Sequence, residues 1–148
     1  MRIKFVFDEK LNEDEVVVNV SPLNNNLDFL RSQLLSRDKP SLDFTKDDQQ
    51  FFIELDEIIF FESYDDSIQA HTIDNHFQVK TRLYELETTL PLNFIRISKS
   101  TIANAKYIYS IERKINSSSL IKFKGTHKEV YVSRHYYQQL NNRIKEIK

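Results

Sequence analysis

The 148-residue sequence predicts a mostly β fold with short helices, in the α+β class. Short stretches of alternating apolar and polar residues recur along the chain, and turn signals such as Asp65-Asp66 and Asp74-Asn75 separate them. Tyr and Phe are abundant, at 7 and 11 residues, and aromatic side chains favour strands. The sequence lacks the long helical patterns that join parallel strands, so a doubly wound parallel sheet is not expected.

Residues 1–45 predict a small β-β-α module. Strands are expected at 3–7 and 16–20, and a helix at 27–34, where leucine recurs at helical spacing. A module of this size buries too little apolar surface to be stable alone. We therefore expect it to pack on the next domain, and to serve dimerisation or partner docking. Residues 37–48, with one proline and many polar side chains, predict a linker.

Residues 46–148 predict the main domain. Its first half contains four expected strands, at 51–55, 58–62, 67–73 and 77–82. Leu83, Leu86 and Leu90 then recur at helical spacing, and Pro91 ends this short helix.

Four more strands are expected in the last third, at 94–97, 107–112, 120–123 and 130–132. Gly125 marks a hairpin turn between the last two. Ser133 is a good N-cap for a C-terminal helix, whose buried face carries Tyr137, Leu140, Ile144 and Ile147. Six aromatic residues at strand spacing are expected in the core: Phe5, Phe52, Phe60, Phe77, Phe94 and Tyr107.

The net charge of −1 hides a strong asymmetry. Residues 96–148 contain 12 Lys and Arg against 3 acidic residues, a balance of +9, and the preceding 95 residues have a balance of −10. Such asymmetry indicates a polyanionic partner such as DNA or RNA. The alternative is that the two sets of charges are solvated faces that pair with each other on folding.

Residue types needed for catalysis do not converge in this sequence. There is no cysteine, the four histidines are scattered, and no nucleophile-elbow or metal-binding spacing occurs. We therefore expect no enzyme activity, no metal and no cofactor. No apolar run is long enough to span a membrane and the N-terminus does not resemble a signal peptide, so we expect a cytoplasmic protein.

The segment 94–108, FIRISKSTIANAKYI, combines cations, hydroxyls and an amide, the groups that contact phosphates and base edges. It resembles the central signature of LytTR-type DNA-binding domains, F-x-R-[IV]-[HS]-[RK]-S-x-[IV]-x-N-x-x-x-I. Nine residues match: Phe94, Arg96, Ile97, Ser98, Lys99, Ser100, Ile102, Asn104 and Ile108.

Three flanking blocks extend the resemblance in the correct order. IIFFES (58–63) is similar to the family's opening strand, RLYELETTLP (82–91) to its short helix, and VSRHYYQQL (132–140) to its closing V-S-R-x-Y motif. Together the blocks cover the main domain, from about residue 46 to 148. The resemblance implies an elongated antiparallel β-sheet domain that binds double-stranded DNA through loops in successive major grooves.

A LytTR-type protein is expected to be a bacterial transcriptional regulator that binds promoter repeats as a homodimer. The first 45 residues are too short for the receiver domain of many relatives, so control by aspartyl phosphorylation is not expected. Receiver-less members are often paired with a small membrane protein that restrains them, and such a partner is expected by analogy.

Nine residues are expected to contact DNA: Arg134, Lys99, Ser98, Ser100, His135, Tyr64, Asp66, Lys124 and Lys128. Arg134 matches the arginine of the V-S-R motif and is expected to pair with guanine, or else to form a salt bridge at a helix start. Lys99 suits a phosphate or single-base contact, and Ser98 replaces a histidine found in many relatives.

Two matching residues have structural alternatives. Arg96 is as well suited to a structural ion pair as to DNA contact, and Asn104 is expected to fix a turn rather than to touch DNA. The 64–67 loop corresponds to a DNA-contacting loop of the family, yet it carries Asp65 and Asp66, which repel phosphate unless one accepts from a cytosine amine. This departure favours an alternative hypothesis, a protein-interaction module that kept the fold and lost DNA binding.

Overall fold

The computed structural model describes residues 41–115 and 118–147, together with Lys10, Val17 and Asn19. The β-β-α module expected in residues 1–45 therefore lies almost wholly outside the described residues. The expected domain boundary at 45/46 falls inside a strand, since β1 spans Phe44–Lys46.

Ten described strands form two antiparallel sheets. The larger has the order β2-β1-β5-β4-β3-β7-β6, and the smaller has the order β10-β9-β8. The larger sheet contains β1 (Phe44–Lys46), β2 (Gln49–Phe51), β3 (Phe60–Tyr64), β4 (Ser67–His71), β5 (His76–Val79), β6 (Phe94–Ser98) and β7 (Thr101–Asn104). The smaller contains β8 (Ile108–Arg113), β9 (Ser119–Phe123) and β10 (Glu129–Val132). This arrangement confirms the mostly β, antiparallel fold.

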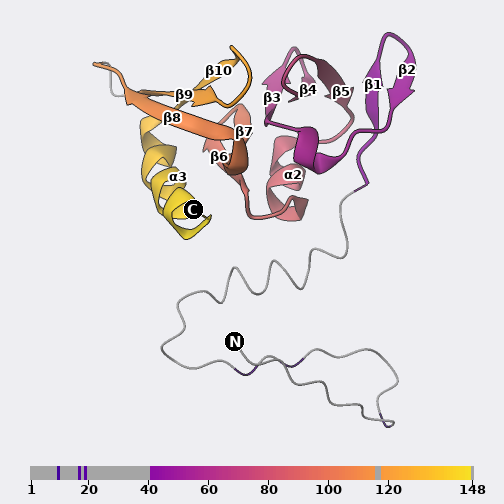
Figure 1. The fold of residues 1–148 in the computed structure, drawn as a ribbon. Helices are drawn as coiled ribbons and strands as arrows, with labels where there is room; N and C mark the ends of the chain where they lie inside the picture. Colours follow the sequence, from indigo (N-terminus) through magenta and orange to yellow (C-terminus); the bar gives the residue numbers. More distant parts are fainter. Residues whose placement is uncertain (1–9, 11–16, 18, 20–40, 116–117, 148) are drawn as a thin grey trace.

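Two α-helices and two 3₁₀ turns complete the described residues: α2 (Leu83–Thr89), α3 (Arg134–Ile147), η1 (Leu55–Glu57) and η2 (Ala105–Tyr107). Both α-helices begin and end close to their predicted positions. The two sheets lie side by side, with α3 beneath β8 and β6 and α2 beneath β3 (Figure 1).

Two apolar clusters hold these layers together. One joins the smaller sheet, β6 and α3 around Ile97, Ile121 and Leu140, all fully buried. The other joins the larger sheet to α2 around Phe61 and Leu86. Each fully buried side chain of this size contributes about 1.5–3 kcal/mol to stability. The clusters hold β6 in place, and the candidate site lies at the C-terminal end of this strand.

Asn104 is the last residue of β7, and its buried polar side chain hydrogen-bonds to three other residues. Its amide donates to the Ile58 carbonyl at 2.8 Å, while its side-chain oxygen accepts from Asn93 Nδ2 at 2.8 Å and from the Lys106 amide at 3.1 Å. The side chain is fully buried and its hydrogen bonds are all internal. The structural interpretation of Asn104 is thus confirmed.

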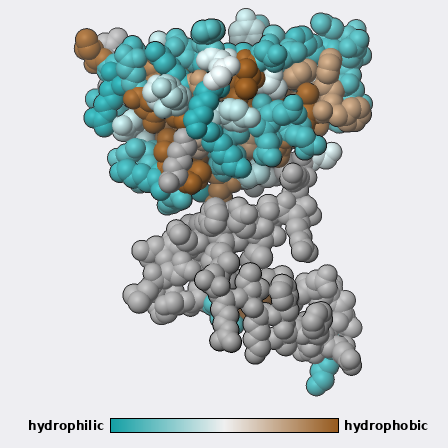
Figure 2. Space-filling view, viewed as in Figure 1, coloured by the Kyte–Doolittle hydropathy of each residue, from teal (hydrophilic) through white to brown (hydrophobic). Residues whose placement is uncertain are grey.

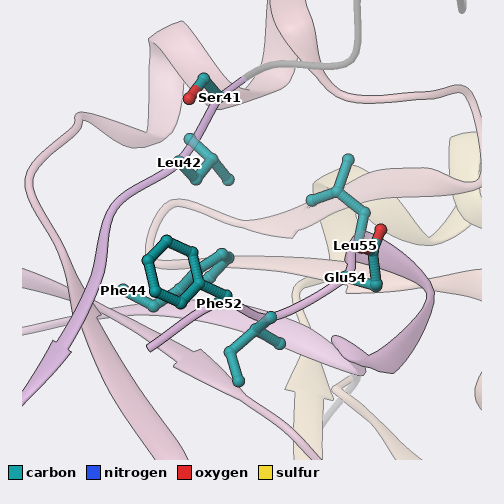
Figure 3. A pocket seen from close by; sticks show the side chains of 7 residues that line it. Ser41, Leu42, Phe44, Phe52, Glu54 and Leu55 are labelled. Carbon is teal, nitrogen blue, oxygen red and sulfur yellow. The ribbon is translucent and has the colours of Figure 1, made fainter. Parts of the chain in front are cut away.

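The expectation that Phe52 lies in the core is wrong, because its side chain is 90% exposed. The preceding residue, Phe51, packs on Phe77 with ring centroids 4.9 Å apart. Since successive side chains of an extended chain point to opposite faces, Phe52 is directed away from the core. Phe52 lines a pocket of about 210 Å³ with Leu42, Phe44 and Leu55 (Figure 3). Apolar side chains also gather on the surface over β1 and β2 (Figure 2).

The predicted strand at 51–55 and the predicted linker at 37–48 are also corrected. Strand β2 ends at Phe51, and the chain then enters η1. A tight hairpin occupies the end of the expected linker, because Asp47 and Asp48 take left-handed φ values of 50° and 61° between β1 and β2. Asp is one of the few side chains that tolerate this conformation.

Candidate nucleic-acid interface

Three segments meet at one end of the larger sheet: the 64–67 turn between β3 and β4, the 98–101 turn between β6 and β7, and residues 133–135 at the start of α3. We call them together the contact edge. The Ser63 amide donates to the Ser100 carbonyl at 2.8 Å, which joins the first two turns. The Ser133 amide donates to the Ile97 carbonyl at 2.9 Å, which places the start of α3 beside the end of β6.

The 98–101 turn presents Lys99 to solvent. The turn is held from inside by Arg96, whose Nε donates to the Ser98 carbonyl at 2.7 Å and whose Nη2 donates to the Lys99 carbonyl at 2.5 Å. Nη1 of Arg96 forms an ion pair with Glu87 of α2 at 3.0 Å. Each nitrogen of the guanidinium therefore contacts a group of the protein, and the ion pair with Glu87 favours the structural role of Arg96 over DNA contact.

The two serines of this turn hold each other. The Ser98 hydroxyl accepts from the Ser100 amide at 3.2 Å and lies 3.3 Å from the Ser100 hydroxyl. Ser98 is half-buried, whereas Lys99 and Ser100 are exposed.

The 64–67 turn has the geometry that suits a two-residue hairpin. Tyr64 pairs with Ser67, and Asp65 and Asp66 between them have φ values of 45° and 60°. Such left-handed pairs match the twist of the flanking strands. The turn thus projects two carboxylates and the Tyr64 ring, which is 64% exposed, at the contact edge.

Arg134 opens α3 and is exposed. No ion pair or hydrogen bond of its guanidinium occurs among the residues that the structure describes, so the salt bridge considered as an alternative has no acceptor there. The first turn of α3 also contains no acidic residue. A cation at the positive end of a helix is unfavourable within the isolated protein. His135 beside it is exposed and contacts the Tyr136 ring edge-on, at 5.1 Å between centroids.

Lys124 and Lys128 lie at the other end of the fold. The turn between β9 and β10 contacts the turn between β4 and β5: Thr126 Oγ1 donates to the Ile73 carbonyl at 2.7 Å. The Lys128 ammonium donates to the Thr72 and Asn75 carbonyls at 2.9 and 2.6 Å. Burial lowers the pKa of this ammonium, against the opposing effect of Asp74. Lys128 is thus a tie between the sheets, while Lys124 is exposed.

A half-buried histidine lies beside this tie. The His71 ring stacks on Phe60, with centroids 4.1 Å apart, and its Nδ1 lies 3.4 Å from Lys128 Nζ. Burial, followed by the positive charges of Lys128 and His76, lowers the pKa of His71 from 6.5 to about 4. Its Nε2 lies 3.2 Å from a Glu62 carboxylate oxygen without the alignment of a hydrogen bond.

Sequence reasoning missed two residues near the contact edge. Lys80 is exposed, and because Val79 pairs with Ile68, Lys80 follows beside Ser67. Glu87 orients Arg96 from a neighbouring helix. The alternation of exposed and buried residues along β5 predicts an exposed side chain at Lys80. The ion pair between Glu87 and Arg96 could not be predicted in this way, because it depends on how α2 packs on the sheet.

An open hollow of about 420 Å³ lies beside the contact edge, between the 98–101 turn and β10. Hydroxyl groups line much of it, including those of Ser98 and Ser133, together with the carboxylates Glu62 and Glu129. In the described part of the chain, no three His, Asp or Glu side chains are grouped so that they could hold a metal ion. No helix there is both long and apolar enough to cross a membrane.

A family model described as the LytTr DNA-binding domain matches residues 48–145. The chain belongs to the LytTr DNA-binding domain family. The solved LytTr DNA-binding domain of a Bacillus cereus protein superimposes with a TM-score of 0.65 over 71% of this chain and 97% of that domain, at 22% identity. The LytTr fold predicted from the sequence motifs is therefore confirmed.

Two curated relatives match almost the full chain. One, from Staphylococcus aureus (strain COL), is 29% identical over 145 residues, which is 97% of this chain and 98% of the relative. Another, from strain Mu50, is 28% identical over the same length. Both are named as uncharacterized HTH-type transcriptional regulators. Together with the LytTr match, they support a DNA-binding transcription regulator and do not favour the alternative of a fold that has lost DNA binding.

The LytTr fold of this chain differs from the helix-turn-helix of the relatives' names. Within the described residues, the strands β6 to β10 separate α2 from α3. The two helices therefore do not form a helix-turn-helix pair, in which a few turn residues join the helices.

Proposed function

We propose that this LytTr protein reads double-stranded DNA by placing the contact edge in the major groove. The observation that carries the proposal is Arg134, an exposed arginine at the positive end of a helix with no acceptor among the described residues. Helix N-termini attract phosphate, and an arginine fork pairs with the O6 and N7 of guanine. A bound duplex supplies the negative charge that the free protein lacks at this position.

Each other residue of the contact edge receives a role that suits its chemistry. Lys99 and His135 contact phosphates as exposed groups on either side of the Ser133–Ile97 hydrogen bond. The hydroxyls of Ser98 and Ser100 donate to phosphate oxygens, and Tyr64 packs on sugar or base. Asp66 accepts a hydrogen bond from the exocyclic amine of cytosine. Because its carboxylate repels phosphate, this contact adds base preference and not general affinity for DNA.

The two remaining residues expected to bind DNA are assigned separately. Lys124 is exposed at the far end of the fold, so we assign it an outlying phosphate contact. Lys128 donates to two carbonyls and would have to leave them to reach phosphate. We therefore assign it the structural tie and not a DNA contact.

We further propose that the protein acts in the cytoplasm by binding and not by catalysis, as a homodimer on paired promoter repeats. Residues 1–45 are proposed to supply the dimer contact or to dock a small membrane protein that restrains the regulator. Size determination of the full chain, free and on repeat DNA, checks the dimer. Recovery of the chain with membranes, through a defined partner, checks the restraint.

Selection of random duplex fragments by the purified full chain, at a stated salt concentration, tests the central proposal. We expect one sequence family to be enriched, with specific binding about 10³-fold or more tighter than binding to unrelated duplex. Enrichment of no sequence at low salt would show that the contact edge does not read DNA.

A further inference from the structure

We propose that Arg96, oriented by Glu87, is a positioning residue for DNA recognition that acts through the 98–101 turn without touching DNA. The inference rests on the proposed function, because it concerns the turn that presents Lys99 to the duplex. Arg96, the arginine of the central LytTR-type signature, thus has a role different from that of Arg134.

The 98–101 turn needs support that the two other two-residue hairpin turns of the larger sheet do not need. Asp47-Asp48 and Asp65-Asp66 have positive φ values, which match the twist of the strands. Ser98 pairs with Thr101, yet Lys99 and Ser100 between them do not have positive φ. Two-residue turns of that kind splay the strands, and here the register shifts between Arg96 and Ser98.

Arg96 supplies the support from one guanidinium group. It donates to two consecutive carbonyls, those of Ser98 and Lys99, at 2.7 and 2.5 Å. The next carbonyl, that of Ser100, accepts from the Ser63 amide. With three carbonyls of the turn fixed toward the protein, the Lys99 side chain remains exposed.

Glu87 holds the guanidinium of Arg96 in place. The ion pair of 3.0 Å joins α2 to β6, and the side chain of Arg96 is only 13% exposed while that of Glu87 is 46% exposed. Arg96 is therefore not placed to contact phosphate. A lysine at this position keeps the charge but lacks the planar fork that spans both carbonyls and the carboxylate.

A double-mutant cycle on the full chain tests this inference, using the duplex enriched by selection. We expect Arg96→Lys to weaken binding to that duplex about tenfold and to lower the salt dependence less than Lys99→Ala does, because Lys99 keeps its charge but loses its fixed position at the phosphate. Lys99→Ala lowers the salt dependence. The losses from Arg96→Lys and Lys99→Ala are expected to be non-additive, since both act through one turn, whereas Arg96→Lys and Arg134→Ala add.

Glu87→Gln is the second variant, because it changes a half-exposed carboxylate and leaves the fold intact. It keeps an acceptor for Arg96 but removes its charge, and about threefold weaker binding is expected. Wild-type affinity of Arg96→Lys, or full additivity of its loss with that of Lys99→Ala, would overturn the inference.

Amide hydrogen exchange separates this inference from the proposed function, because it needs no DNA. In Arg96→Lys, exchange at the amides of Ser100 and Ser63, which donate to the Ser98 hydroxyl and the Ser100 carbonyl, should accelerate about tenfold or more, while exchange in α3 around Leu140 stays at the wild-type rate. Unchanged exchange at the turn would reject the bracing role, whatever the DNA result. A chain that selects no sequence, but shows this acceleration, would reject the proposed function and retain the brace.

Discussion

The Ser133 amide donates a hydrogen bond of 2.9 Å to the Ile97 carbonyl, and this hydrogen bond joins the two segments that carry Arg134 and Lys99. The first segment starts α3, and the second ends β6. Lys99 and Arg134 are 35 positions apart in the sequence, yet the fold makes them parts of one surface. The predictions below separate their contributions.

Arg134→Ala should weaken binding to the selected duplex by about 1–3 kcal/mol and relax the preference at one base pair. This is the loss expected when the proposed bidentate contact with guanine is removed. Titration of labelled duplexes, each altered at one position, measures both effects. Arg143→Ala on the same helix is the control, since its side chain is near Glu146 at 3.9 Å and away from the helix start. Equal effects of the two variants would contradict the role of Arg134.

Lys99→Ala should weaken binding nearly evenly across sequences and reduce the slope of log affinity against log salt by about one unit. A lysine is a flexible point charge, so its loss removes a phosphate contact and little base preference. Binding isotherms at several salt concentrations give the slope. Lys106→Ala, an exposed lysine in η2, should leave the slope unchanged.

Asp66→Gly should stabilise the protein by about 1 kcal/mol, because glycine adopts the φ of 60° without strain. Asp48→Gly is a matched control, with a φ of 61° in the turn between β1 and β2. Urea unfolding should show similar gains for both variants. Only Asp66→Gly should also raise affinity for unrelated duplex and lose preference at one cytosine, and an equal change in both variants would argue against base contact by Asp66.

His71 should make the protein acid-sensitive. Its pKa is about 4 in the folded state and near 6.5 when unfolded, so the folded state disfavours the protonated ring. The contribution to stability is complete above pH 6.5 and is lost as the pH falls from 6.5 toward 4. The full difference amounts to about 3 kcal/mol.

Urea unfolding of wild type and His71→Phe between pH 7 and pH 4 measures this contribution. The variant keeps an aromatic ring on Phe60 and should lose less stability over that range than wild type does. His127→Gln, at an exposed histidine, should follow the wild-type curve. Parallel curves for wild type and His71→Phe would show that another group is responsible.

Strand positions and helix faces could be predicted from the sequence because they depend on local periodicity. Ile68 and Ala70 alternate with polar neighbours and are buried, and Leu83 and Leu86 are buried at helical spacing. Strand β7 was not among the expected strands, because the 98–101 turn that precedes it has neither glycine nor proline and is held by Arg96 instead.

Contacts between distant segments could not be predicted in this way. Phe52 fits an alternating pattern, but β2 is an edge strand whose inner face is already taken by Phe51. Lys124 and Lys128 were assigned to DNA by charge alone. Only the packing of their hairpin on the turn between β4 and β5 reveals that they lie away from the contact edge.

That packing has a consequence for the nucleic acid. The two sheets are linked at one end by Ser133 and at the other by Thr126 and Lys128. The span from the 64–67 turn to Arg134 is therefore set by the folded protein. A duplex whose groove does not match that span has to bend or change its groove width, at a cost that depends on its base steps. If the proposed contacts are made, base pairs between them that the protein does not touch should influence affinity through their stiffness.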